Sequence, residues 1–212
     1  MKICVYRKNY NVYNSPIMLE LRKKYKSGSA AEIIRNAILS GEISGEIGQN
    51  EFADSLGISR IPVREALINL EYHGLIAKLP NQHVRIISLD DRMIRDIFSD
   101  MSLLEIETVK TLSAGKLQNL SSLSQIEFHR ELYMNTHSPL RKNFLRITTE
   151  TYITFIIEHS DGAKISPVFE NLKHALDDIG ILRAGYTVYA EVLASELIRI
   201  WNDNRRKNHA EP

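Results

Sequence analysis

The strongest constraint in this sequence is a series of three short apolar stripes at helical spacing, joined by turns that contain glycine. The first stripe begins at Ala30, and Gly41 follows it where a helix is expected to end. The members of the first two stripes are Ala30, Ile33, Ile34, Ala37, Ile38, Phe52, Ala53 and Leu56. A second helix is expected over residues 49–56, and Gly57-Ile58-Ser59 forms a tight turn before the third. This order predicts a helix-turn-helix arrangement.

The third helix is expected to begin after Ser59, which is a good N-cap residue. Pro62 fits its first turn, because the first amides of a helix have no intrahelical partner. Its buried stripe is predicted to consist of Val63, Ala66, Leu67 and Leu70. Arg60 and Arg64 are four residues apart, so we expect them on one face, opposite this stripe. An arginine fork can bond guanine in the major groove or clamp a phosphate, which makes this face a candidate DNA contact.

Two strand-like runs follow the third helix, at residues 75–79 and 83–87, and Pro80-Asn81-Gln82 separates them. Asn81 is the residue best able to adopt a positive φ at the tip of such a hairpin. Three helices followed by a hairpin predict a winged helix-turn-helix domain, in which the third helix and the wing contact DNA.

Between Ser29 and Ser88 the sequence resembles the GntR family of bacterial transcriptional regulators. The resemblance rests on Gly57-Ile58-Ser59-Arg60-Ile61-Pro62-Val63-Arg64-Glu65-Ala66-Leu67, on Leu70 and Gly74-Leu75-Ile76, and on Phe52-Ala53 with Leu56 upstream. It implies a homodimer on a near-palindromic double-stranded operator. The DNA-contacting positions that it implies are Asn50, Ser59, Arg60, Ile61, Arg64, Asn81 and Gln82. Asn50 stands where the family often has an arginine, so one charged contact is lost there or moves to the basic N-terminal segment.

Charge is unevenly distributed along the 212 residues. Residues 1–88 hold 12 lysines and arginines against 8 acidic residues, whereas residues 89–212 hold 15 against 18. This asymmetry fits a DNA-binding head on a sensing or dimerising body. The cluster Arg22-Lys23-Lys24-Tyr25-Lys26 is either part of a solvated tail or an arm that contacts phosphates. We expect an N-terminal extension (1–26), a winged helix-turn-helix domain (27–88) and an all-α effector-binding or dimerisation domain (89–212).

Several classes of protein are excluded by composition. The longest apolar runs stop at about six residues, as in 152–157, and a membrane helix needs about 18. The N-terminus lacks a secretory signal pattern, and the single cysteine, Cys4, excludes an intrachain disulfide framework and a cysteine-rich zinc site. We therefore expect a cytoplasmic protein that does not bind membranes.

From Asp90 onward every periodic stretch is helical. Five helices are expected, over residues 94–109, 120–132, 140–157, 169–182 and 186–201. This mainly α-helical body is similar to the effector-binding domain of the FadR-like branch of the family, in a shortened and divergent form. Only 23 residues separate Glu105 from His129, so a helix of the usual pattern is expected to be missing.

The FadR-like pattern implies a metal held by an acidic residue four positions before a histidine and by two later histidines. The corresponding positions here are Gln125, His129, His174 and Glu196. A glutamine amide carries no charge, whereas Glu196 suits a hard or borderline cation, so the sequence leaves binding of a divalent metal open. Met101 replaces an arginine that many relatives have, which argues against an organic acid bound in the usual way.

Three functions are compatible with these features. We predict a dimeric transcriptional regulator, expected to act as a repressor, with a small-molecule effector bound in the helical domain. The alternative keeps the DNA-binding head, but its helical domain only dimerises or binds a partner protein. A hydrolytic centre of His129, His174 and Glu196 is the third, but the sequence has no nucleophile elbow and no phosphate-binding glycine loop. We therefore predict that the protein is not an enzyme.

Overall fold

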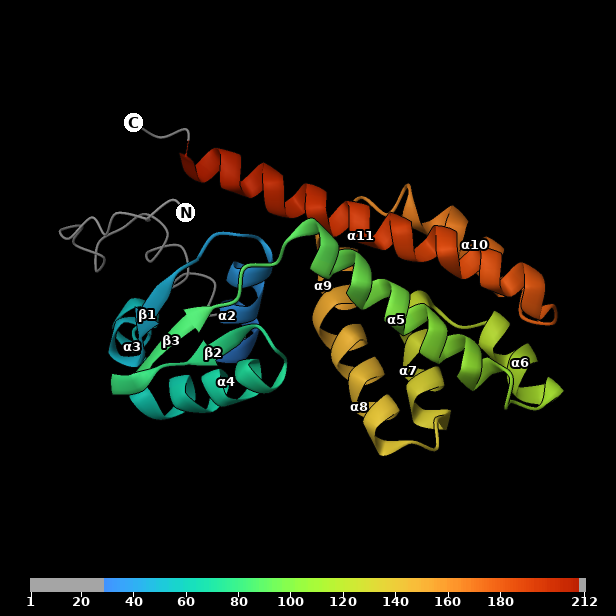
Figure 1. Ribbon diagram of the computed structural model, residues 1–212, viewed down its shortest axis with the longest axis horizontal. Coiled ribbons are helices and arrows are strands. Elements are labelled where there is room, and N and C mark those ends of the chain that lie inside the picture. Colours follow the sequence, from blue (N-terminus) through green and yellow to red (C-terminus); the bar gives the residue numbers. More distant parts are fainter. Residues whose placement is uncertain (1–28, 210–212) are drawn as a thin grey trace. The chain divides into compact units, whose positions relative to one another are not determined.

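The computed structural model describes residues 29–209 (Figure 1). The predicted N-terminal extension, with Cys4 and the basic cluster at residues 22–26, lies outside these residues. The chain divides into two compact units between Ile87 and Ser88. Within residues 29–87 the first unit contains three α-helices and a small antiparallel sheet, and the second is built from helices, which confirms the predicted fold class.

The helices of the first unit are α2 (Ala30–Leu39), α3 (Gln49–Leu56) and α4 (Arg60–Tyr72). Ser29 and Glu32 form a capping box at the start of α2, where the Glu32 carboxylate accepts a hydrogen bond from the Ser29 amide at 2.8 Å. Gly57 ends α3 with a φ of 68°, a left-handed conformation that favours glycine. Ser59 precedes α4 as predicted, but its side chain makes no capping hydrogen bond.

The sheet consists of β1 (Glu46–Gly48), β2 (Ile76–Lys78) and β3 (His83–Ile86), in the order β1-β3-β2. The predicted hairpin between β2 and β3 is confirmed, and Asn81 has a φ of 62° at its tip. The sequence did not predict β1, because three residues are too few to show an alternating pattern. It pairs with β3 and places Ile47 opposite Val84.

The core of the first unit is the predicted set of apolar stripes, closed by the sheet. Helices α2 and α4 pack against each other, and α3 packs against α4. The side chains that become almost wholly inaccessible include Ile34, Ile38, Phe52, Leu56, Val63, Leu67, Leu70, Leu75 and Val84. This packing fixes which side of α4 faces outward.

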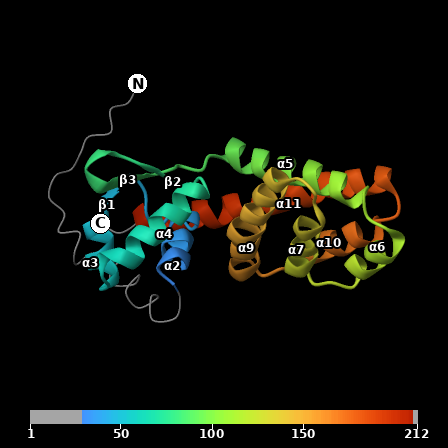
Figure 2. The ribbon, with the colours of Figure 1, turned by 90° about the horizontal axis from the view of Figure 1, so that it is seen from below.

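The second unit contains seven α-helices in the described part of the chain (Figure 2). They are α5 (Asp91–Val109), α6 (Ala114–Ser121), α7 (Gln125–Asn135), α8 (Pro139–Ile147), α9 (Thr154–His159), α10 (Ile165–His174) and α11 (Ile179–His209). A π-helical segment, Thr148–Ile153, joins α8 to α9 without a break. Helix α11 packs along α5, and the remaining helices complete the core around this pair. No helix in residues 29–209 is long and apolar enough to cross a membrane.

Two of the five predicted helices are in fact two helices each. The expected helix 120–132 is interrupted because Ser124 and Glu127 form a capping box that starts α7. The expected helix 169–182 is interrupted because the Asp178 carboxylate accepts hydrogen bonds from the amides of Gly180 and Ile181, at 2.8 and 3.0 Å. Local capping by polar side chains therefore overrides an apolar periodicity that continues across both breaks.

Candidate functional sites

The exposed side of α4 combines two arginines with an apolar ridge. Arg60 and Arg64 are exposed, and no hydrogen bond or ion pair joins either guanidinium to another described residue. At about 100° per residue, the direction opposite the buried stripe belongs to Ile61, Ile68 and Tyr72, which are 70%, 47% and 59% exposed, and to the exposed Glu65. The prediction that the arginines lie opposite the stripe is therefore wrong in detail. They lie on one flank, and three apolar side chains and one glutamate form the outermost ridge.

Ion pairing separates these two arginines from the other cations of the first unit. Lys78 pairs with Glu71, and Arg85 donates to the Glu46 carboxylate at 2.7 Å. Residues 29–87 hold five lysines and arginines against seven acidic residues, while residues 1–28 hold seven against one. The basic excess of the N-terminal part thus belongs to residues 1–28, and the folded unit offers Arg60 and Arg64 as its accessible unpaired charges.

The remaining predicted DNA contacts are spread over three elements of the first unit. Ser59 is exposed at the N-cap of α4, Asn50 is exposed in the first turn of α3, and Asn81 is exposed at the tip of the wing. The side chain of Gln82 lies outside the described part of the structure. At the start of α3 the Glu51 carboxylate accepts a hydrogen bond from the Gly48 amide at 3.0 Å, so this helix end already carries a negative charge.

In the second unit, four polar side chains from three helices form a hydrogen-bonded chain in the core. His129 of α7 is fully buried; its Nδ1 lies 2.7 Å from Oε1 of Glu105 on α5. Its Nε2 lies 2.7 Å from the hydroxyl of Tyr189 on α11. Gln125 Nε2 donates to the same hydroxyl at 2.6 Å. Two of the four predicted metal-binding residues, Gln125 and His129, are therefore brought together, but around a tyrosine hydroxyl.

The other two predicted metal-binding residues lie elsewhere. His174 is exposed at the end of α10. Glu196 is buried, and its carboxylate accepts hydrogen bonds from Lys164 at 3.0 Å and from Arg199 at 2.8 Å. Burial alone would raise the pKa of Glu196, but the bonds from Arg199 and Lys164 outweigh burial and lower it.

The four residues that the FadR-like pattern singles out do not come together in one site. Within residues 29–209, no group of three or more histidine, cysteine, aspartate or glutamate side chains is placed to hold a metal ion. The physical reason is that the His129 imidazole is held between Glu105 and Tyr189, while Glu196 is neutralised by two cations of its own. The residues present do not fit a bound metal.

Sequence reasoning missed Tyr189, and it used Glu105 only for its spacing from His129. The Tyr189 ring stacks on the His129 ring with centroids 5.6 Å apart and planes within 11°. Tyr189 belongs to the apolar stripe of a long helix, and a tyrosine in such a stripe is usually an ordinary core residue. A buried tyrosine hydroxyl needs a polar partner, so its place in the stripe was the only sign in the sequence that a polar contact lies there. Met101, in the position of the family's arginine, is fully buried in the core.

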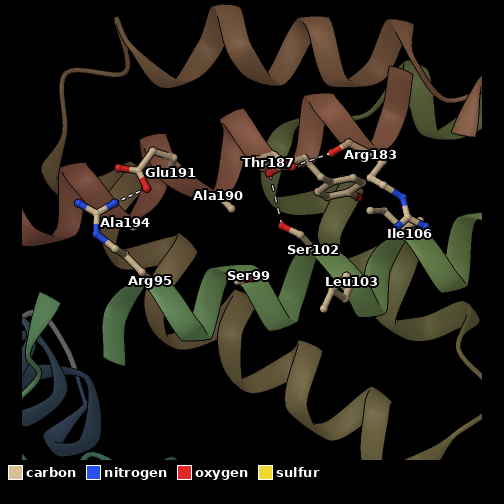
Figure 3. Close-up of a pocket in the computed structure, with 11 residues that line it drawn as sticks. Arg95, Ser99, Ser102, Leu103, Ile106, Arg183, Thr187, Ala190, Glu191 and Ala194 are labelled. Carbon is tan, nitrogen blue, oxygen red and sulfur yellow. Dashed lines mark hydrogen bonds and ion pairs between the residues drawn. The ribbon is translucent and has the colours of Figure 1, made fainter. Parts of the chain in front are cut away.

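A groove of about 320 Å³ lies between α5 and α11 (Figure 3). Its floor is formed by apolar and small side chains, among them Leu103, Ile106 and Ala190. An ion pair between Arg95 and Glu191 spans one end. Arg183 lines the other end; it is exposed and makes no ion pair or side-chain hydrogen bond with a described residue. The groove therefore combines an apolar floor with one available positive charge.

Comparison with known proteins places the first unit in a family. Residues 26–86 match the family described as "Bacterial regulatory proteins, gntR family". Over 56 residues the chain is 41% identical to the uncharacterized HTH-type transcriptional regulator Rv0043c of Mycobacterium tuberculosis H37Rv. The regulator MT0049 of strain CDC 1551 matches equally well. The aligned part is 26% of this chain and 22% of either relative, so it covers about a fifth of the length of these curated proteins.

Solved structures resemble the chain over a larger part of its length. The structure described with Lar, which controls the Listeria monocytogenes agr system, covers 80% of this chain and 95% of that chain. Its TM-score is 0.52 and its identity 15%, a similarity of fold. McbR/YncC of E. coli covers 89% of this chain and 99% of that chain, with 17% identity and a TM-score of 0.48.

The matched family and relatives are transcriptional regulators and not enzymes. The part of the chain that matches them contains α4, the turn at Gly57 and the wing hairpin. Residues 26–86 of the chain are therefore similar to the gntR family of bacterial regulatory proteins.

Proposed function

We propose that the protein is a dimeric, sequence-specific transcriptional repressor whose helical unit binds a small-molecule effector. The observation that carries the DNA-binding part is the presence of two exposed, unpaired arginines on α4 of a gntR-type domain. Each copy inserts α4 into the major groove and lays its wing beside it, on a near-palindromic operator.

The mixed surface of α4 suits direct reading of base edges. Arg60 and Arg64 have free guanidinium groups, which bond guanine in a bidentate manner, and Ile61 offers an apolar contact for a thymine methyl group. Ser59, Asn50 and Asn81 are short polar side chains suited to phosphate oxygens, which position the domain without reading sequence.

Loss of Arg64 tests this proposal. We expect Arg64→Ala to weaken binding to the preferred duplex by about 1–3 kcal/mol and to relax the preference at one base pair. The duplex is first obtained by selection from a random pool, where a palindrome with fixed half-site spacing is expected. Arg92→Ala, an exposed arginine of the helical unit, is the control and leaves affinity unchanged. Equal affinity of Arg64→Ala and wild type would remove Arg64 from the interface.

We also propose that residues 1–26 supply phosphate contacts. The folded part of the first unit carries more acidic than basic residues, so it attracts DNA poorly through its net charge. The seven cations of residues 1–28 reverse this balance. Lysines and arginines contribute to affinity by releasing counterions from the phosphate backbone, without a requirement for base sequence.

For the helical unit, we propose that the groove between α5 and α11 binds an organic anion with an apolar body. The apolar floor at Leu103 and Ile106 suits the body, and Arg183 suits the charged group. Such a ligand regulates DNA binding only if it binds the DNA-competent and incompetent states unequally.

A thermal-shift screen with aliphatic and aromatic carboxylates tests the effector proposal. A carboxylate present at about 100 times its Kd is expected to stabilise the protein by about 2.7 kcal/mol. Arg183→Ala removes this shift, while Arg92→Ala keeps it. If no carboxylate raises the melting temperature, the alternative is favoured, in which the helical unit only dimerises or binds a partner protein.

A further inference from the structure

We propose that a hydrogen-bonded chain centred on the Tyr189 hydroxyl replaces a metal ion in the core of the helical unit, so that this unit is stable without metal. The chain links α5, α7 and α11 through Glu105, His129, Tyr189 and Gln125. Two of its members, Gln125 and His129, are positions at which the FadR-like pattern has metal ligands, and here both form hydrogen bonds within the protein. This inference does not depend on the proposed effector or on DNA binding.

The direction of each hydrogen bond follows from the donors available. Gln125 Nε2 is a donor only, so the Tyr189 oxygen accepts from it. In the proposed arrangement, the Tyr189 O–H donates to Nε2 of His129, and the ring proton lies on Nδ1 and is donated to Glu105 Oε1. Each of these three hydrogen bonds thus joins a donor to an acceptor, while the second carboxylate oxygen of Glu105, Oε2, is buried without a hydrogen-bond partner.

This arrangement engages both ring nitrogens of His129, and the one unpartnered carboxylate oxygen, Glu105 Oε2, belongs to no group of three or more potential ligand residues in the described part of the chain. A histidine binds metal through the lone pair of an unprotonated ring nitrogen. In the proposed arrangement, that lone pair of His129 accepts a hydrogen bond from the Tyr189 hydroxyl. Tyr189 is itself a poor ligand in this position, because burial and the nearby Glu105 raise the pKa of its hydroxyl well above the ordinary value. Gln125 offers a neutral amide in place of a carboxylate.

Aromatic side chains pack around His129 and Tyr189 in the core and leave both inaccessible to solvent. Tyr189 and His129 are fully buried, and Phe128 and Phe169 make ring contacts with His129 at centroid distances of 5.4 and 6.3 Å. A metal ion bound here would have to displace the Tyr189 hydroxyl from both of its partners. A structural metal joins elements that are distant in sequence, and the tyrosine-centred chain does the same for three helices.

Metal titration of the full-length protein is the first test. The protein is expected to contain far less than one metal ion per chain by elemental mass spectrometry. Its melting temperature is expected to stay the same in EDTA and after addition of Zn²⁺, Mn²⁺ or Ni²⁺. One ion per chain whose removal lowers the melting temperature would overturn the proposal.

The protonation state of His129 is the second test, and it reports on the chain itself. In ¹⁵N NMR of the metal-free protein, Nδ1 of His129 is expected to carry the proton and Nε2 to be unprotonated. Added Zn²⁺ leaves both resonances in place. A resonance of His129 that moves on addition of Zn²⁺ would contradict the proposal, whether or not any variant folds.

A pair of tyrosine variants separates the chain from ordinary core packing. Tyr189→Phe keeps the ring but removes the hydroxyl, so it is expected to lower the melting temperature and to shift the His129 Nε2 resonance. Tyr133→Phe is the control; its hydroxyl donates to Glu150 at 3.1 Å in a half-buried position, and the His129 resonances stay unchanged. A Tyr189→Phe protein with the wild-type melting temperature and His129 spectrum would remove Tyr189 from this role.

Discussion

The outer side of α4 and the polar chain through Tyr189 bring their residues together in opposite ways. Arg60 and Arg64 are one helical turn apart, exposed and without partners, so their arrangement is determined by a single helix. The polar chain is buried, and its members come from three helices separated by up to 84 residues in the sequence. A surface that binds a partner can therefore be recognised from a short motif, whereas a core site depends on how distant helices pack.

The two units also differ in how they treat charge. In the first unit, the charges relevant to function are left unpaired at the surface. In the core of the second, polar groups form internal hydrogen bonds and ion pairs, as Glu196 does with Lys164 and Arg199, whereas Arg183 at its surface makes no ion pair with a described residue. Unpaired surface charge is available to a ligand such as DNA, whereas a satisfied buried network stabilises a particular packing and resists a new ligand.

The largest effect is expected from loss of His129. The His129→Ala variant leaves the buried Glu105 carboxylate without its hydrogen-bond donor and opens a cavity in the core, which is expected to cost about 3 kcal/mol or more. Urea unfolding followed by tryptophan fluorescence measures this effect in the helical unit, because the chain's single tryptophan, Trp201, lies in α11.

His174→Ala is the matched control for this prediction. His174 is exposed, so its removal is expected to change stability by no more than about 0.5 kcal/mol. If the two histidines were ligands of one metal, both variants would be destabilised and both would lose metal. Similar losses of stability in the two variants would therefore break the contrast between the buried chain and the exposed residue.

The sequence was sufficient for features that depend on local periodicity and turn chemistry. The apolar stripe of α4, the glycine at the end of α3 and the positive φ of Asn81 each follow from short stretches. The orientation of Arg60 and Arg64 was only partly predictable. Four-residue spacing places them on one side of the helix, but spacing alone does not give their angle from the buried stripe, which puts them beside it and not opposite it.

Features that depend on pairing between distant segments were beyond the sequence. Strand β1 forms because its backbone pairs with the free edge of β3, and its three residues are too few to show an alternating pattern in the sequence. Tyr189 reaches His129 across 60 residues of sequence, and nothing in its own helix distinguishes it from a core tyrosine. Glu196 matches a ligand position by spacing, yet Lys164 from another segment neutralises it.

The charge contrast can be sharpened by changing the salt dependence of DNA binding. Lys23→Gln together with Lys24→Gln is expected to reduce the slope of log Kobs against log salt concentration by about 2, if both lysines neutralise phosphates. The preferred base sequence stays the same, because phosphate contacts do not read it. Lys110→Gln with Lys116→Gln removes two exposed cations of the helical unit and is expected to leave the slope unchanged. Equal slopes in all three proteins would assign residues 1–26 to a solvated tail.

The smallest effect concerns an ion pair at the surface of the helical unit. Arg130 of α7 donates two hydrogen bonds to Glu150 in the π-helical segment, at 2.7 and 2.6 Å. These bonds outweigh burial and lower the pKa of Glu150 from its ordinary value of 4.5. A carboxyl group with a lowered folded-state pKa stabilises the protein above its unfolded-state pKa, and this contribution is lost as the pH falls through the folded-state pKa.

Glu150→Gln is therefore expected to lower the free energy of unfolding at pH 7 by about 0.5–1 kcal/mol, because both side chains are partly exposed and solvent screens the pair. The difference from wild type shrinks below pH 4.5 and disappears once Glu150 is protonated in the folded protein. Glu158→Gln, an exposed glutamate of α9, shows little difference at either pH. A Glu150→Gln deficit that persists unchanged in acid would mean that packing of the side chain, and not its charge, provides the stability. In that case, Glu150 would stabilise the helical unit through the fit of its side chain, as the buried polar groups do, and not through an ion pair.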